Sequence, residues 1–417
     1  MTLVFLTCPG YGFTNTTKFF LKELVDIGNT VYYFSSDKYQ SVANDCGCIF
    51  VSYDQCFTTH TKEDIKNYDV CYSLKNALNQ SIEQWNSQKK VIEKTIDLIA
   101  HINPDIIIHD SCMYSGKYIG KLLGIKTVSV YATIPLSDKT KNERYDFLAK
   151  NYFNFNPVSN SENTEKSIKR VKQFIEHYLN EIFPIPNYFE IYQSSENLNI
   201  VFSPYEIIPY NEDFGKNYLF ISQFNYNHIV QNIKSTKQPL VYISFGTSWI
   251  PNEKIINYLL KSLDTSQFKV IFSLGDNTFD MRNKTIPNNF VIKSFVNQNE
   301  VLQRADLFIG SGGMTSVYEA INFGVPMLLI PFAQADHYIL AEQIEKHKCG
   351  IKINFNDIYK VDLLSTVSYI LKNEYFKKNT IKLCNSLAKP NSIKHAINEL
   401  IAYANTNEEK NNETIGN

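Results

Sequence analysis

Short apolar strands alternate with amphipathic helices along this chain, and the alternation begins twice. In the first half, an apolar strand at residues 2–8 leads through the turn CPGYGFTN into an amphipathic helix at residues 16–28 and a second strand at residues 29–36. A strand, a helix and a strand in this order form a βαβ unit, which implies a parallel sheet. The pattern therefore predicts an α/β fold.

The second alternation starts at LVYISFGT, residues 240–247, and continues through VPMLLIPF, residues 325–332. A chain of 417 residues suits two or three domains. We predict a Rossmann-like N-terminal domain at residues 1–228, a linker at 229–238, a Rossmann-like C-terminal domain at 239–388, a helix that returns to the first domain at 389–405, and a disordered polar tail at 406–417.

Composition excludes some classes of protein. The net charge of −1 argues against a protein that binds nucleic acid or an anionic membrane by bulk electrostatics. Eight cysteines are scattered without a CxxC pair, so we expect reduced thiols and no metal site. The N-terminus lacks the features of a signal peptide, and no apolar run reaches the ~20 residues of a membrane span. We expect a cytoplasmic protein.

Three glycine-containing turns follow predicted strands: CPGYGFTN, ISFGTS and FIGSGGMTS. In open parallel sheets, ligands bind beyond the carboxyl ends of the strands. Ser311, Gly312, Gly313 and Met314 lie where a strand leads into a helix, whose free amides favour a phosphate group. The alternative is an ordinary strand-to-helix turn. The spacing matches neither the dinucleotide fingerprint nor the P-loop, which argues against an NAD-dependent oxidoreductase.

The neighbouring residues favour a nucleotide-sugar site. Glu319 lies one turn into the helix and could hold two sugar hydroxyls, although a solvent-facing glutamate is the alternative. Phe295 and Gln298 share one upstream loop, where an aromatic ring could stack on a base and an amide could contact its edge; the alternative for Phe295 is a core position. Asp336 and His337 follow the next strand, at the next carboxyl-end loop.

This ordered set resembles the nucleotide-binding signature of macrolide-type UDP-glycosyltransferases. The family order is aromatic-x-Pro-Gln, His-Gly-Gly-x-Asn-Ser-x-x-Glu, Gly-x-Pro, and then Pro and Asp-Gln. The corresponding residues here are Phe295, Asn297, Gln298, Ser311, Gly312, Gly313, Thr315, Ser316, Glu319, Gly324, Pro326, Pro331, Asp336 and His337. The resemblance implies the GT-B fold, with two facing Rossmann-like domains, parallel sheets and a cleft between them.

The resemblance also implies a role for each residue. The donor would lie in the C-terminal domain. Phe295 would stack on the uracil, Gln298 would contact the base or ribose, and Glu319 would hold the ribose hydroxyls. Asp336 and His337 would contact the sugar, and the residues around the diphosphate would be Gly246, Thr247, Ser311, Gly312, Gly313, Met314 and Ser316. The acceptor would lie in the N-terminal domain, beside Gly10, Tyr11 and Gly12. A UDP-sugar is the co-substrate, and no cofactor or metal is expected.

Two departures from the family pattern concern chemistry. Ser311 replaces a histidine that hydrogen-bonds the diphosphate, so we expect weaker donor binding. Phe13 replaces the histidine that deprotonates the acceptor, although Asp110, the carboxylate that orients this histidine, is present. The nearby candidates to replace the base are His109, Tyr11 and Asp110 itself. His109 is discounted because alternate residues of a strand point to opposite faces.

Two hypotheses about function follow from these departures. In the first, the protein is an inverting glycosyltransferase that moves a hexose from a UDP-sugar to a hydrophobic small molecule. Its acceptor is then acidic, or Asp110 takes the proton directly. In the second, the protein is a catalytically impaired GT-B protein that acts as a nucleotide- or ligand-binding helper.

Overall fold

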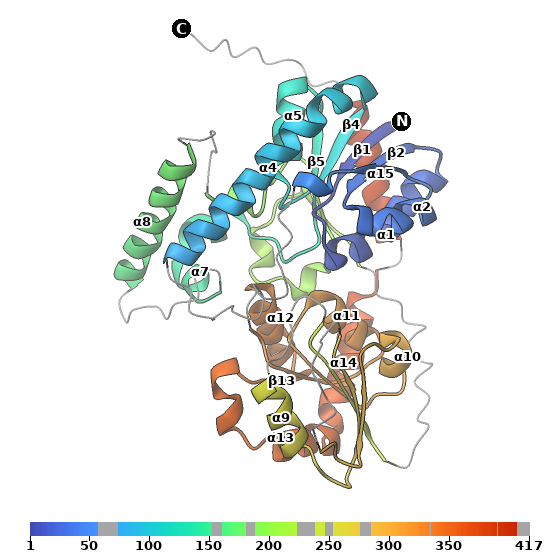
Figure 1. Cartoon of the computed structure of the whole chain (residues 1–417), viewed down its shortest axis with the longest axis vertical. Helices are drawn as coiled ribbons and strands as arrows, with labels where there is room; N and C mark the ends of the chain where they lie inside the picture. Colours follow the sequence, from blue (N-terminus) through green and yellow to red (C-terminus); the bar gives the residue numbers. More distant parts are fainter. Residues whose placement is uncertain are drawn as a thin grey trace.

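The computed structural model has two lobes, each built around a parallel sheet (Figure 1). It describes residues 1–56, 74–151, 161–180, 188–222, 238–246, 253–275, 285–332, 335–389 and 391–406. Most of the predicted linker (229–237) and tail (407–417) lies outside the described residues.

The first lobe contains a seven-stranded sheet in the order β3-β2-β1-β4-β5-β6-β7, and each neighbouring pair is parallel. Its strands are β1 (Thr2–Leu6), β2 (Thr30–Ser35), β3 (Ile49–Ser52), β4 (Ile106–Asp110), β5 (Thr127–Tyr131), β6 (Asn199–Val201) and β7 (Tyr218–Phe220). Its α-helices are α1 (Tyr11–Asp26), α2 (Gln40–Asp45), α4 (Leu74–Ile102), α5 (Tyr114–Leu123), α6 (Asp138–Glu143), α7 (Tyr145–Asn151) and α8 (Ser161–Asn180).

The second lobe contains a six-stranded parallel sheet in the order β10-β9-β8-β11-β12-β13. Its strands are β8 (Leu240–Ser244), β9 (Lys269–Ser273), β10 (Phe290–Lys293), β11 (Leu307–Gly310), β12 (Met327–Leu329) and β13 (Gly350–Lys352). Its α-helices are α9 (Glu253–Ser262), α10 (Gln298–Leu302), α11 (Met314–Asn322), α12 (Ala335–Lys346), α13 (Leu363–Lys372) and α14 (Glu374–Leu387).

Both faces of each sheet are covered, which explains why the central strands are continuously apolar. In β1, Leu3 and Phe5 pack in one hydrophobic cluster, whereas Val4 and Leu6 pack in another on the opposite face. Residues of β8 divide in the same way between two clusters of the second lobe. Parallel sheets buried on both faces lack the polar alternation of a half-exposed sheet. The α/β fold predicted from the sequence is confirmed.

The two lobes pack against each other through a shared core. Ile134, Ile207 and Ile208 of the first lobe are buried in a hydrophobic cluster formed mainly by the second lobe. Beside this cluster, the hydroxyl groups of Ser203 and Tyr318 form a hydrogen bond. These contacts hold the two sheets in one orientation relative to each other.

The last helix, α15 (Ser392–Asn405), lies in the first lobe although α14 before it lies in the second (Figure 1). Its buried residues Ala396, Ile397 and Leu400 pack in the same cluster as Leu3 and Phe5. The α15 helix is the helix that the sequence places at residues 389–405. It ties the end of the chain to the first sheet.

Three predicted loops are shorter than expected because helices begin inside them. The turn predicted at residues 8–15 ends at Gly10, since α1 begins at Tyr11. Gln298 begins α10, and Asp336 and His337 lie in the first turn of α12. The loop positions predicted for Gln298 and Asp336 were therefore wrong by one or two residues, since both side chains lie in the first turn of a helix. Helices α2, α4, α13 and α14 and strands β3 and β13 were not predicted.

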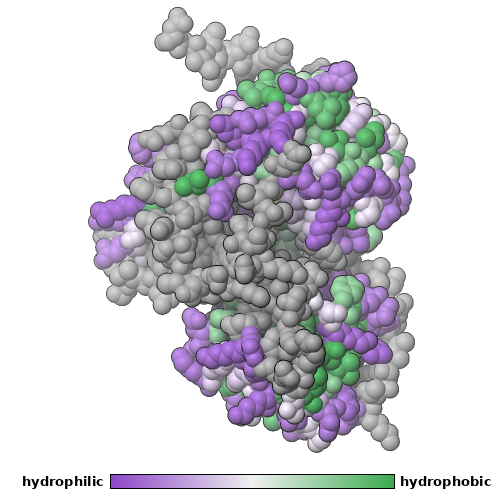
Figure 2. All heavy atoms as spheres, viewed as in Figure 1, coloured by the Kyte–Doolittle hydropathy of each residue, from purple (hydrophilic) through white to green (hydrophobic). Residues whose placement is uncertain are grey.

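The described surface is chemically mixed. Figure 2 shows hydrophilic side chains on both lobes, interspersed with smaller hydrophobic groups. Within the described residues, no helix combines the length and hydropathy that crossing a bilayer requires.

Candidate active site

The glycine turn after β11 lies beside the end of β8. Gly310 pairs with Ser244 in the parallel register, so the chain leaves both strands at the same edge of the sheet. The Ser311 hydroxyl donates a hydrogen bond of 3.4 Å to the carbonyl oxygen of Phe245. Gly246 follows with a φ of +83°, a conformation that favours glycine. The two turns therefore form one backbone-lined edge; Thr247 lies outside the described residues.

Helix α11 begins at this edge with unoccupied amides. Gly313 is its N-cap residue, and no side chain caps the helix at this end. Such an end presents free N–H groups and the positive end of the helix dipole. Met314, the first helical residue, is buried in the core and fixes the start of the helix. This arrangement suits a phosphate group.

His337 packs directly against the same turn. A Cβ on Gly312, whose φ is +91°, would lie 2.7 Å from the His337 carbonyl oxygen. A Cβ on Gly313 would lie 3.5 Å from His337 Nε2 and 4.0 Å from the Ser311 hydroxyl oxygen. Both glycines therefore allow the α12 backbone and the imidazole ring to approach the turn. The imidazole and the Ser311 hydroxyl converge on one point beside the free amides.

Gln298 and Glu319 are joined by a hydrogen bond, although they lie on different helices. The Gln298 amide nitrogen donates to the Glu319 carboxylate and, at 3.1 Å, to the Ser316 hydroxyl. The Tyr242 hydroxyl donates to the Gln298 side-chain oxygen at 3.0 Å, which fixes the orientation of the amide. The sequence analysis missed Tyr242. The signal was a tyrosine inside the apolar strand LVYIS, two residues before its end.

Burial shapes the electrostatics of Glu319. Burial raises the pKa of the Glu319 carboxyl above its ordinary value, whereas the Gln298 hydrogen bond and the charge of Lys18 oppose this rise. Lys18 belongs to α1, and α1 and α11 contact each other across the two lobes. Glu319 thus faces the junction between the lobes, which rules out an ordinary solvent-facing glutamate.

Phe295 is not a core residue. Its side chain is 77% exposed, the largest value among the exposed large hydrophobic residues. It lies three residues before Gln298, where its ring is free to stack on a planar group. Asp336 lies in the first turn of α12, and its carboxylate accepts a hydrogen bond of 3.1 Å from the His337 amide.

Asp110 is the most perturbed carboxyl group at the edge of the first sheet. It is fully buried at the end of β4, and its Oδ2 accepts hydrogen bonds from the Thr7 hydroxyl at 2.6 Å and the Cys8 amide at 2.5 Å. Its Oδ1 has no hydrogen-bond partner in the described part of the chain. Burial raises the pKa of Asp110 to about 7, against the lowering effect of these hydrogen bonds. A carboxyl group with this pKa can exchange a proton near neutral pH.

The first turn of α1 lies close in sequence to the groups that bind Asp110. Gly10 is the extended N-cap residue, and its carbonyl oxygen accepts the Thr14 amide at 3.0 Å. Phe13 is half-buried, and a Cβ on Gly10 would lie 3.1 Å from its ring. Gly12 is exposed in the same turn.

His109 points to the opposite face of the first sheet. Its Nε2 lies 3.0 Å from Glu196 Oε1, and its Cβ would clash with any side chain at Gly116 of α5. The expectation that His109 and Asp110 face opposite sides is confirmed.

The two-lobed fold is that of a known class of proteins. A solved structure of the glycotransferase of kitacinnamycin matches this fold with a TM-score of 0.75 at 15% identity, covering 97% of this chain and 98% of the other. The two facing parallel α/β lobes are those of the GT-B glycosyltransferases.

The chain belongs to the UDP-glucoronosyl and UDP-glucosyl transferase family, whose model matches residues 44–394. It is 23% identical over 406 residues to a Bacillus subtilis (strain 168) protein named uncharacterized UDP-glucosyltransferase YojK, covering 94% of this chain and 95% of the relative. It is 24% identical over 405 residues to the NDP-glycosyltransferase YjiC of the same organism, covering 95% and 96%. The protein is a UDP-glycosyltransferase.

Proposed function

We propose that the protein is an inverting glycosyltransferase that moves a hexose from a UDP-sugar to a hydrophobic small molecule. The observation that carries the donor side is the Gln298–Glu319 hydrogen bond beside the uncapped start of α11. Glu319 holds the two ribose hydroxyls, with Gln298 on the ribose or base. Phe295 stacks on uracil, which agrees with its high exposure.

The diphosphate lies against the first turn of α11. The helix amides donate hydrogen bonds to its oxygens, and the Ser311 hydroxyl does so by turning away from the Phe245 carbonyl oxygen. His337 Nε2 adds a further donor beside Ser311, which offsets part of the loss of the family's turn histidine. Charge-assisted hydrogen bonds of this kind are about twice as strong as neutral ones. Asp336 is left to contact the sugar hydroxyls.

Asp110 accepts the proton of the acceptor hydroxyl. Because its carboxyl group is fully buried, the proton reaches it through an intervening water or hydroxyl. The acceptor oxygen then attacks C1 of the sugar, the bond from C1 to the UDP oxygen breaks, and UDP leaves with that electron pair. Asp110 belongs to the first lobe and the diphosphate turn to the second, which supports attack from the side opposite to UDP.

The test is transfer from UDP-α-glucose and other UDP-hexoses to flat phenols and alcohols. Released UDP measures turnover, and the anomeric proton of the product, followed by NMR, reports its configuration. A β-glucoside from UDP-α-glucose supports the proposal, whereas an α-glucoside contradicts inversion. Tight UDP-sugar binding without transfer or hydrolysis would instead favour the helper hypothesis, for which the phenylalanine at position 13 is the motivating observation.

A further inference from the structure

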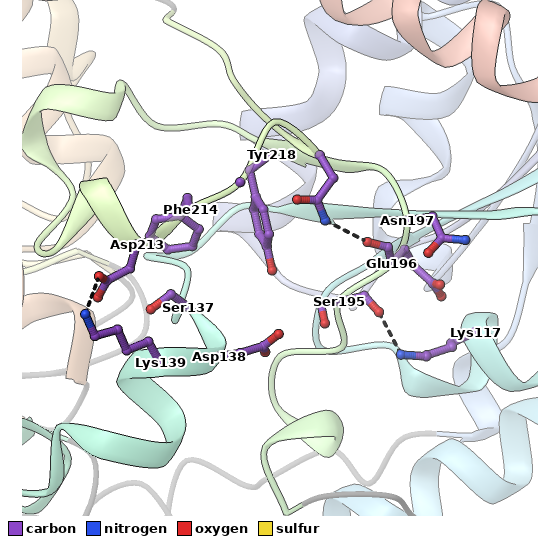
Figure 3. Close-up of a pocket in the computed structure, with 12 residues that line it drawn as sticks. Lys117, Ser137, Asp138, Lys139, Ser195, Glu196, Asn197, Asp213, Phe214 and Tyr218 are labelled. Carbon is purple, nitrogen blue, oxygen red and sulfur yellow. Dashed lines mark hydrogen bonds and ion pairs between the residues drawn. The ribbon is translucent and has the colours of Figure 1, made fainter.

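A cavity of about 430 Å³ lies in the first lobe (Figure 3), and its lining residues include none of the donor-site residues. It is bounded by Lys117 of α5, by the start of α6, and by the segments that precede β6 and β7. The His109–Glu196 pair lies at this side, the sheet face opposite to Asp110. A volume of this size falls within the range of about 300–1,000 Å³ that small-molecule sites occupy.

The lysines that line the cavity are already paired. Lys117 Nζ lies 2.9 Å from Glu190 Oε2 and 2.7 Å from the Ser195 carbonyl oxygen. Lys139 Nζ lies 3.5 Å from Asp213 Oδ1. An anionic ligand would therefore have to displace existing ion pairs. A phosphorylated ligand is disfavoured for this reason.

Two lining side chains retain hydrogen-bonding capacity. The Asp138 side chain is 81% exposed, and its nearest cation is Lys141 Nζ at 3.6 Å. Asn197 is also exposed. Asn217 lies beside them and donates a long hydrogen bond of 3.4 Å to the Glu196 carbonyl oxygen. A carboxylate accepts hydrogen bonds from neighbouring hydroxyls, and a side-chain amide can accept and donate at the same time.

Aromatic rings provide the apolar part of the wall. The Tyr218 phenol extends into the space between Ser137, Asp138 and Ser195 (Figure 3). Phe214 packs edge-on against this ring, with the ring centroids 4.9 Å apart. Both rings are only half-buried. A ligand here would meet one aromatic surface and a border of hydrogen-bonding groups.

We propose that this cavity binds a neutral saccharide, with a sugar ring against Tyr218 and its hydroxyls on Asp138 and Asn197. Polar groups dominate the wall, which disfavours a hydrophobic ligand, and the paired lysines disfavour an anion. A sugar ring, which has an apolar face and many hydroxyl groups, matches the aromatic surface and the hydrogen-bonding groups of the wall. The proposal does not depend on the donor site.

The experiment titrates maltose into the full chain by saturation-transfer NMR, once without UDP and once with saturating UDP. Glucosamine and glucose 1-phosphate provide a cationic and an anionic sugar for comparison. We expect maltose to bind with UDP present, and glucose 1-phosphate to bind at least tenfold more weakly. Competition between maltose and UDP, or preference for the phosphorylated sugar, would overturn the proposal.

The variant pair for this test is Asp138→Ala with Asn197→Ala, two exposed changes that should leave the fold intact. Maltose affinity should fall at least tenfold in the double variant, and its melting temperature should match the wild type. Glu319→Ala, which disables the proposed donor site, should leave maltose binding unchanged. Undetectable maltose binding to the wild type, or equal binding to the double variant, would refute the assignment.

Discussion

The α-carbon of Gly312 approaches the backbone of His337 so closely that a Cβ would lie 2.7 Å from the His337 carbonyl oxygen. Residues that are 25 positions apart in the chain therefore share one turn, at the carboxyl edge of the second sheet. Because Gly312 has no side chain, the backbone of α12 can pack directly against the turn that leads into α11. This contact sets the shape of the proposed diphosphate site.

Substitution of Gly312 by alanine should abolish UDP binding. The added Cβ forces the turn away from His337, and the φ of +91° adds strain of about 1–3 kcal/mol. Isothermal titration calorimetry with UDP measures the loss. Gly28→Ala is the matched control, since Gly28 has a φ of +93° with open space around it. If both variants bind UDP like the wild type, the turn does not hold the diphosphate.

Phe295→Ala should weaken UDP binding by roughly 5- to 150-fold, because stacking on a base contributes about 1–3 kcal/mol. Affinity for inorganic diphosphate should stay unchanged, since this ligand has no base. Competition binding with both ligands separates the two effects. Tyr369→Ala, another exposed aromatic residue, is the control. Equal losses for UDP and diphosphate would argue against stacking.

Asp110→Asn should lower kcat/KM by about 10²–10⁴-fold, the usual contribution of a general base. The wild-type rate should rise with pH through the pKa of Asp110, about 7, because the ionised form accepts the proton. This rise should be absent in the variant. A variant with the same pH profile as the wild type would exclude Asp110 as the base.

The same substitution should change stability in a pH-dependent way. The folded-state pKa of Asp110 is raised from 3.8 to about 7, so the stabilisation from its protonated form is fully present below pH 3.8 and lost as pH rises through about 7. With about 1.4 kcal/mol for each pKa unit, the loss is of the order of 4 kcal/mol. Asp110→Asn should therefore unfold at higher urea concentration than the wild type at pH 8, but not at pH 4. Asp264→Asn, a change at an exposed aspartate, is the control. If the difference in stability between Asp110→Asn and the wild type is the same at pH 4 and pH 8, burial of Asp110 does not carry the assigned cost.

Phe13→His should raise turnover on an ordinary alcohol at least tenfold. Histidine at this position supplies a base beside the existing carboxylate, and a general base contributes about 10²–10⁴-fold. The gain should be largest for alcohols and small for phenols, whose hydroxyl is already acidic. Phe13→Gln provides a polar control without a base. An equal gain in both variants would mean that polarity, rather than proton transfer, limits the rate.

The repeating pattern of strands and helices was enough to predict two parallel sheets and the position of the glycine turn. These features are local: apolar runs such as PDIIIHDS and a glycine pair before an amphipathic segment determine them. The order of strands within each sheet needs contacts between distant segments. Helix α4 was not predicted, although residues 74–102 carry polar residues on one face and buried apolar residues such as Val91 and Ile99 on the other.

The supporting parts of the site were harder to predict. Tyr242 orients Gln298 through a hydrogen bond between residues 56 positions apart, so the tyrosine within the strand LVYIS is visible in the sequence but its partner is not. Likewise, the approach of His337 to Gly312 depends on the placement of β12 next to β11. The resemblance to a family predicted which residues would face the donor, whereas the contacts that support those residues required three-dimensional coordinates.

The central claim is that Glu319 and the start of α11 hold the ribose and diphosphate of a UDP-sugar. The most direct measurement is calorimetric titration of UDP and of 2′,3′-dideoxy-UDP into the wild type and Glu319→Ala. Hydrogen bonds to a charged group contribute about 1.5–3 kcal/mol, so the variant should bind UDP roughly 10- to 150-fold more weakly. The dideoxy ligand should bind both proteins equally, because it lacks the hydroxyls that Glu319 holds. Equal UDP affinity for the two proteins would contradict the account.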